Sequence, residues 1–114
     1  MSSQPYSDTA PTREAIEAER GLLLLDFGTD WCGHCRAASA VVDTWIAAHR
    51  GVRHQRVEDG RGRPLGRSFA VKLWPSLVLL RDGVEIARVV RPRDARELEP
   101  LGEALADLRD DPAA

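Results

Sequence analysis

The sequence predicts a single α/β domain in which a central mixed β-sheet of four to five strands is flanked by helices on both faces. Three observations point to this fold class. Residues 22–27 form a strand-length apolar run with hydrophobic side chains on both of its faces, as in a strand covered from both sides. A helical pattern follows over 33–49, and the pair Asp82-Gly83 separates two further apolar runs, as in a β-hairpin.

The composition is that of one soluble globular domain. The chain has 114 residues, of which 43% are hydrophobic and 30% charged, which suffices for one sizeable core. The net charge of −2 implies no general attraction to nucleic acid, and no apolar stretch approaches the length of a membrane span. No positively charged start leads into an apolar segment, so we expect no signal peptide and a cytoplasmic location.

The first part of the chain contains a polar arm, a helix and a strand. Residues 1–10 are rich in Ser and Pro and predict a flexible arm. A helix is expected over 11–20, with Thr12 as its cap and Gly21 closing it. In the strand that follows, alternation places Asp26 on a buried face, where burial is expected to raise the carboxyl pKa and to strain the native state. Replacement of Asp26 by asparagine is therefore expected to leave stability unchanged or raise it.

The remaining elements complete one domain over residues 11–110. The helix over 33–49 directs Ala38, Val42 and Trp45 towards the sheet. A weakly patterned strand over 52–57, a loop over 58–63 and a short helix over 64–70 follow. The strands 76–81 and 84–90 form the hairpin. Asp94 and Glu97 resemble a capping pair, and the leucine stripe that follows predicts a last helix, which Pro100 interrupts and which we expect to start or bend there. Residues 111–114 predict a frayed tail.

The two cysteines of the chain, Cys32 and Cys35, are three residues apart at the start of a predicted helix. Such a pair can form a disulfide or hold a metal. The helix N-terminus favours a thiolate, so Cys32 is expected to have a lowered pKa and to be the nucleophile. Cys35 lies one turn further in, where it can attack a mixed disulfide formed at Cys32. The imidazole of His34 can stabilise the neighbouring thiolate.

The motif Trp-Cys-Gly-His-Cys at 31–35 resembles the active site of the thioredoxin superfamily. Protein disulfide isomerases have a histidine at this position before the second cysteine, whereas most thioredoxins have a proline there. The resemblance implies a thioredoxin fold and a thiol–disulfide oxidoreductase that exchanges its dithiol with protein disulfides, as a reductase or isomerase. It also implies that Asp26 helps to deprotonate Cys35, although a hydrogen-bonded aspartate without a role would fit the same position. The usual first strand of the family has little room here, and we expect it to be absent or vestigial.

The resemblance extends to a proline later in the chain, Pro75. Pro75 follows Cys35 by forty residues and opens a strand, at the place where the family has a cis-proline packed against the dithiol. That proline frees the backbone of the preceding residue for a substrate strand, although a proline opening a strand needs no functional reason. Trp74 departs from the family pattern and, if exposed, would form an aromatic docking surface with Trp31. Arg91 stands where the family has a glycine, which suggests a narrower, more basic rim.

We therefore expect the catalytic residues to be Cys32, Cys35, Asp26 and His34, and the substrate-binding residues to be Trp31, Gly33, Trp74, Pro75 and Arg91. No cofactor or metal is expected, because two cysteines do not make a structural zinc site. The expected partners are disulfide-containing proteins and an external reductase or oxidant such as a thioredoxin reductase, with no nucleic acid or membrane, and the protein is expected to be a monomer. The alternative is a thioredoxin-fold binding or chaperone module whose dithiol is incidental.

Overall fold

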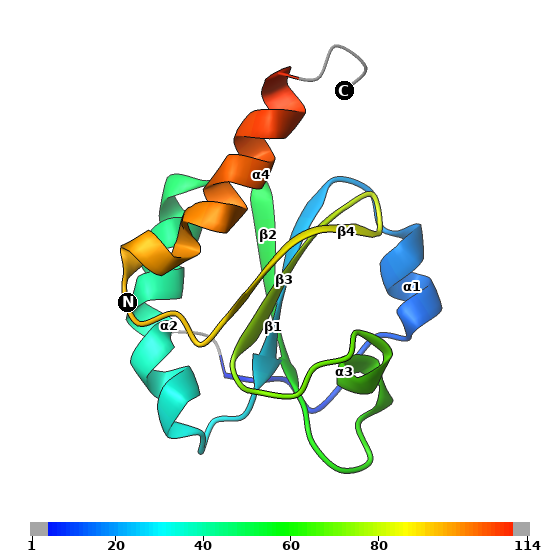
Figure 1. Cartoon of the computed structure of the whole chain (residues 1–114). Coiled ribbons are helices and arrows are strands. Elements are labelled where there is room, and N and C mark those ends of the chain that lie inside the picture. Colours follow the sequence, from blue (N-terminus) through cyan, green and yellow to red (C-terminus); the bar gives the residue numbers. More distant parts are fainter. Residues whose placement is uncertain (1–4, 111–114) are drawn as a thin grey trace.

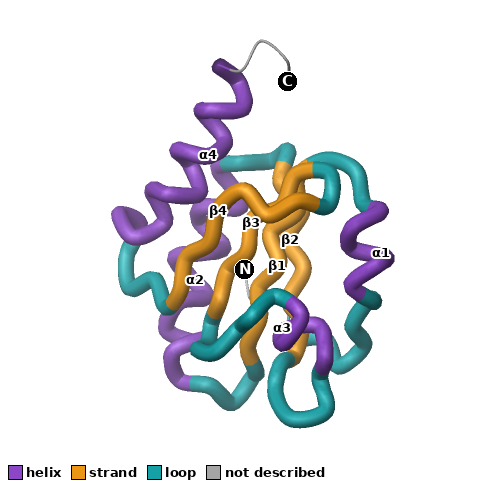
Figure 2. Tube along the Cα trace, turned by 45° about the vertical axis from the view of Figure 1, so that its right-hand side comes forward, coloured by secondary structure: helices purple, strands orange, loops and turns teal. Residues whose placement is uncertain are grey.

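A computed structural model describes the backbone of residues 5–110 and the side chains of residues 5–108. It contains a four-stranded sheet with the strand order β2-β1-β3-β4, and Figure 2 shows the strands side by side. In Figure 1, α2 and α4 lie on one side of this sheet and α1 and α3 on the other. The elements, in chain order, are α1 (Arg13–Ala18), β1 (Leu22–Gly28), α2 (Gly33–Ala48), β2 (Val52–Glu58), α3 (Pro64–Ser68), β3 (Ser76–Arg81), β4 (Val84–Val90), the 3₁₀ helix η1 (Ala95–Leu98) and α4 (Glu99–Asp110).

The central strand is β1, which confirms the prediction from its apolar run. It pairs in parallel with β2 and antiparallel with β3, so its residues are covered on both edges and both faces. The residues from Leu23 to Gly28 are all buried. The register of the parallel pair sets Asp26 opposite Arg56, and this pairing shapes the site described below.

Two hydrophobic cores cover the two faces of the sheet, and alternation along β1 divides its side chains between them. One core lies under α1 and α3, and the other lies under α2, η1 and α4. The first contains Ile16, Leu23, Leu25, Phe27, Val57, Leu65, Phe69, Val78 and Leu80. The second contains Leu24, Ala38, Val42, Val52, Leu77, Leu79, Val89, Leu98 and Leu101. This arrangement confirms the fold class.

Local signals explain where several elements begin and end. The Oγ1 of Thr12 accepts a hydrogen bond from the N–H of Ala15 at 3.0 Å and starts α1, which is shorter than predicted. The hairpin between β3 and β4 turns through Asp82 and Gly83, whose φ angles of 50° and 82° are the left-handed pair that a tight hairpin requires. Asp94 caps η1 by accepting from the N–H of Glu97 at 3.1 Å.

The N-terminal segment differs from the predicted flexible arm. Ser7 forms a single parallel bridge with Val57, through backbone hydrogen bonds from Ser7 N to Arg56 O (3.2 Å) and from Glu58 N to Ser7 O (2.9 Å). The side chain of Tyr6 is only 8% exposed. The arm is therefore docked from residue 6 onward, and the bridge is the vestige of the first strand. Residues 1–4 and the predicted tail at 111–114 lie outside the described residues.

Within the described part of the chain, every helix falls short of the length and hydropathy that a bilayer-spanning segment requires.

Candidate active site

The two cysteines lie at the start of α2, which follows β1 in the chain. Cys32 is the N-cap residue of α2, and its Sγ accepts a hydrogen bond from the backbone N–H of Cys35 at 3.3 Å. This bond satisfies one of the N–H groups that the first turn of a helix leaves without an intrahelical partner. The prediction that Cys32 sits at a helix start is confirmed.

Cys35 lies one turn further in and is more buried, with 1% of its surface exposed against 8% for Cys32. Both are free thiols. Burial raises the pKa of Cys35 to about 12, and a hydrogen bond with Cys32 acts in the same direction. The backbone of Thr29 and the nearby hydroxyl of Tyr6 oppose this rise. Cys35 is therefore protonated at neutral pH, and it needs a proton acceptor before it can act as a nucleophile.

Asp26 is buried as predicted, but it is not a strained, uncompensated charge. Its Oδ2 accepts from the Nε of Arg56 and lies against the Nε2 of His54, each at 3.0 Å, and its Oδ1 accepts from the hydroxyl of Tyr6 at 2.7 Å. Arg56 also reaches Asp43 at 3.4 Å. These partners argue against the expected strain, because a buried charge with an opposite charge and several donors is largely compensated.

The partners of Asp26 come from β2 and from the N-terminal segment, and sequence reasoning missed them. Arg56 is the register partner of Asp26, and His54 projects from the same face of β2 because it lies two residues earlier. The run of polar residues from Arg53 to Arg56 in the edge strand β2 was the available signal. Tyr6, the single tyrosine of the chain, stood out as an aromatic residue in a polar arm.

Tyr6 lies inside the site. Its ring forms one cluster with Cys32, Cys35 and Trp74. Burial raises the pKa of Tyr6 far above the ordinary range of a phenol, and the neighbouring Asp26 carboxylate adds to the rise. The phenol therefore stays neutral and can donate one hydrogen bond while accepting another.

The other residue predicted to act on the thiols, His34, forms no hydrogen bond with either of them through its ring. It is exposed on the first turn of α2, and no hydrogen bond joins its ring to any other described residue. Gly33 is exposed beside it, with open space where a side chain would lie. The role of His34 as a stabiliser of the thiolate stays a prediction, and any such effect would act through space.

The predicted docking residues meet around Pro75. The Trp74–Pro75 peptide bond is cis, as predicted, and Pro75 is buried. Trp31 is 75% exposed, and its ring packs edge-on against Trp74 with the ring centroids 5.6 Å apart. The indole N–H of Trp74 donates to Asp59 at 2.8 Å, which fixes that ring half-buried beneath Trp31. The two tryptophans form one aromatic surface next to the cysteines.

Arg91 adopts a left-handed backbone conformation with a φ of 52°, which suits the glycine that the family has there. Its Nε donates to the carbonyl of Trp74 at 2.7 Å, and its N–H donates to the carbonyl of Pro75 at 2.9 Å. The guanidinium thus binds the loop before the cis-proline. It occupies a carbonyl that the resemblance would leave free for substrate.

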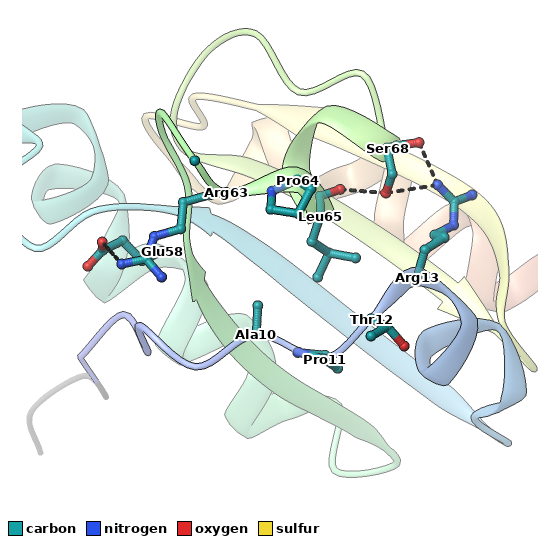
Figure 3. A pocket seen from close by; sticks show the side chains of 10 residues that line it. Ala10, Pro11, Thr12, Arg13, Glu58, Arg63, Pro64, Leu65 and Ser68 are labelled. Atoms are coloured by element: carbon teal, nitrogen blue, oxygen red, sulfur yellow. Dashed lines mark hydrogen bonds and ion pairs between the residues drawn. The ribbon is translucent and has the colours of Figure 1, made fainter.

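A cavity of about 370 Å³ lies away from this site, between the segment leading into α1 and helix α3. Figure 3 shows its lining, with the ion pair between Arg63 and Glu58 at one end and Arg13 bound to Ser68 at the other. None of the predicted site residues lines it. Among residues 5–108, no group of three or more His, Cys, Asp or Glu side chains could hold a metal ion.

Comparisons with known proteins agree with this geometry. The family model for thioredoxin matches residues 6–103. The chain is 34% identical over 82 residues to thioredoxin from Chlamydia trachomatis and 32% identical over 81 residues to thioredoxin from Chlamydia pneumoniae, in each case covering 71% of this chain and 79% of the relative. The structure of thioredoxin 2 from Pseudomonas aeruginosa PAO1 in its reduced form aligns with a TM-score of 0.81 and 51% identity, covering 91% of this chain and 96% of that chain.

Proposed function

The chain belongs to the thioredoxin family and is a thiol–disulfide oxidoreductase, and we propose that its substrates are protein disulfides, which it reduces or isomerises. One observation carries the proposal. Cys32 caps α2 with its sulfur bound to the N–H of Cys35, while the buried Cys35 thiol lies directly behind it. A nucleophile at the surface and a resolving thiol one turn inside are the two parts that disulfide exchange needs.

The exchange takes place in two steps. The Cys32 thiolate attacks one sulfur of the substrate disulfide, forming a mixed disulfide and releasing the other substrate sulfur as a thiolate. Cys35 then attacks the sulfur of Cys32, which forms the Cys32–Cys35 disulfide and releases the second substrate thiolate. Two electrons pass from the dithiol to the substrate. The surface of Trp31 and Trp74 would hold the substrate chain during both steps, since exposed aromatic residues are common anchors of protein interfaces.

The proposal includes a partner and a compartment. An external reductase of the thioredoxin reductase class would return the protein to its dithiol form, so the protein would carry electrons and contribute to redox homeostasis as a monomer. We place it in the cytoplasm. The support is that both cysteines of the chain belong to the redox motif, so no structural disulfide requires an oxidising compartment.

Reduction of insulin by dithiothreitol tests the activity. The wild-type protein should accelerate the precipitation of the insulin B chain, and Cys32→Ser should abolish the acceleration. Cys35→Ser should instead accumulate a mixed disulfide with the substrate, which mass spectrometry detects. Equal acceleration by the wild-type protein and Cys32→Ser would contradict the proposal and favour a binding module. Refolding of scrambled ribonuclease then separates isomerase from reductase activity.

A further inference from the structure

The resolving step of the exchange requires an acceptor for the proton of Cys35. The thiol is buried and protonated at neutral pH, so bulk water does not reach it readily. Asp26 is the family's expected proton acceptor. In this structure, however, the hydroxyl of Tyr6 lies close to the Cys35 sulfur, since the two side chains share one buried cluster and crowd the same point above Gly28. The carboxylate of Asp26 is reached through that hydroxyl.

The position of Tyr6 is held by its backbone. Its N–H donates to Oδ1 of Asp30 at 3.0 Å, and the next residue, Ser7, pairs with the edge of β2. Figure 1 shows this segment passing beside the end of β1 where the chain turns towards α2. The ring is therefore placed between the central strand and the cysteines, and its hydroxyl has a fixed direction.

Gly28 shows independently that the phenol and the sulfur lie close together. A methyl group built on Gly28 would overlap the Sγ of Cys35 and would lie 2.9 Å from Cζ and 3.0 Å from the hydroxyl oxygen of Tyr6. The sulfur and the hydroxyl thus approach the same point above the backbone of β1. Only a glycine leaves room for both.

Charged groups hold the far side of Asp26. Arg56 and His54 of β2 bind Oδ2, and Oδ1 remains for the hydroxyl of Tyr6. Arg56 is in turn paired with Asp43 of α2. The carboxylate therefore presents one oxygen to Tyr6 in a fixed orientation.

We propose that the hydroxyl of Tyr6 relays the proton of Cys35 to Asp26, so that the N-terminal segment supplies a catalytic residue for the resolving step. The inference rests on the two-step exchange described above.

The phenol of Tyr6 stays neutral during the relay, because it accepts one proton as it gives up another. As the proton of the Cys35 thiol moves to the oxygen of Tyr6, the phenol's own proton moves to Oδ1 of Asp26. The sulfur of Cys35 then attacks the sulfur of Cys32, the bond from Cys32 to the substrate breaks, and the substrate leaves as a thiolate. Asp26 keeps the proton. When the disulfide is reduced again, Cys35 leaves as a thiolate and recovers the proton by the reverse route.

The test uses Tyr6→Phe, which keeps the ring and removes the hydroxyl. Reduced protein is mixed with excess dithiobis(nitrobenzoate) in a stopped-flow instrument. Attack by Cys32 releases the first thionitrobenzoate, at a rate that depends on reagent concentration, and resolution by Cys35 releases the second. Tyr6→Phe should slow the second release by about tenfold or more and leave the first within about twofold, since general acid–base catalysis typically contributes such factors or larger.

The pH dependence separates a relay from a packing role. In the wild-type protein Asp26 is the base, so the second release should vary little with pH. In Tyr6→Phe the proton must leave to solvent, so its rate should rise with pH towards the pKa of Cys35. The charged or titratable groups that face the relay are Cys32, Asp30, Arg56 and His54. His54→Gln identifies any contribution from the histidine.

Asp26→Asn provides the second variant. It should slow the second release to a similar extent, and the double variant with Tyr6→Phe should be no slower than the slower single variant, because both act on one proton path. A second release that Tyr6→Phe leaves unchanged would overturn the relay. Equal slowing of both releases would assign Tyr6 a structural role, and effects that multiply in the double variant would show separate paths. Loss of the first release by the wild-type protein would count against the proposed function, not the relay.

Discussion

Replacing Asp26 by asparagine should destabilise the reduced protein by about 3 kcal/mol at neutral pH, because it breaks a buried ion pair. The side chains of Asp26 and Arg56 are each only 2% exposed. Removing one partner of such a pair typically costs about 3–5 kcal/mol. Asp43, which is 36% exposed, stays near Arg56 and compensates part of its charge, which places the expected loss at the lower end.

The hydrogen bonds of Asp26 point in the same direction. Two donors converge on Oδ2 and a third on Oδ1, whereas an asparagine offers one oxygen and one NH₂ group. In either orientation the NH₂ group faces a donor, and an unsatisfied buried polar group costs about 1–3 kcal/mol. From the sequence alone the same substitution was expected to be neutral or stabilising, so the experiment decides between the two accounts.

Urea denaturation followed by tryptophan fluorescence measures the loss. The matched control is Asp43→Asn, which changes the exposed end of the same ion-pair chain and should cost no more than about 1 kcal/mol. The double variant of Asp26→Asn with Arg56→Met should recover part of the loss, because it removes the unpaired cation. A loss below about 1 kcal/mol for Asp26→Asn would refute the reasoning that the ion pair stabilises the core.

Four further predictions concern other parts of the site. Gly28→Ala should destabilise the protein by about 1–3 kcal/mol by overpacking, whereas Gly51→Ala, which meets nothing within 4 Å, should not, as thermal denaturation would show. The reduced protein should lose stability as the pH rises from about 9 to 12, because the unfolded chain releases the proton of Cys35 at a lower pH than the folded protein does. Cys35→Ala should make this loss of stability smaller. Arg91→Gly should lower KM for insulin at unchanged kcat by freeing the carbonyl that Arg91 binds, and an unchanged KM would contradict this. His34→Pro should lower the reduction potential by about 30 mV in a glutathione titration, and no change would mean that the exposed imidazole does not act on the dithiol.

Much of the fold could be predicted because its signals are local. The apolar run of β1, the helical spacing of α2 and the turn pair at 82–83 each reflect the period or dihedral preference of a single element. The same holds for the catalytic pair, because the position of Cys32 and Cys35 at a helix start depends only on residues of that helix. The chain's identity as a thioredoxin-family oxidoreductase was therefore accessible from its motif.

The N-terminal segment shows where local reasoning fails. A polar stretch without periodicity predicts a loose arm, yet one bridge from Ser7 to β2 and the burial of Tyr6 dock it into the site. Arg91 is a similar case, since nothing in its local sequence indicated that its guanidinium binds the carbonyl of Trp74. Both outcomes depend on contacts with residues far away in the sequence.

The sequence by itself determined the strand that carries Asp26, the helix that presents Cys32 and Cys35, and the proline that precedes β3. Only the tertiary structure decided what surrounds Asp26, because the parallel register of β1 and β2 brings Arg56 and His54 to its side. A shift of that register by one residue would turn both side chains to the other face of the sheet. The alternation of a strand shows which residues share a face, but the pairing between strands decides which charges meet there.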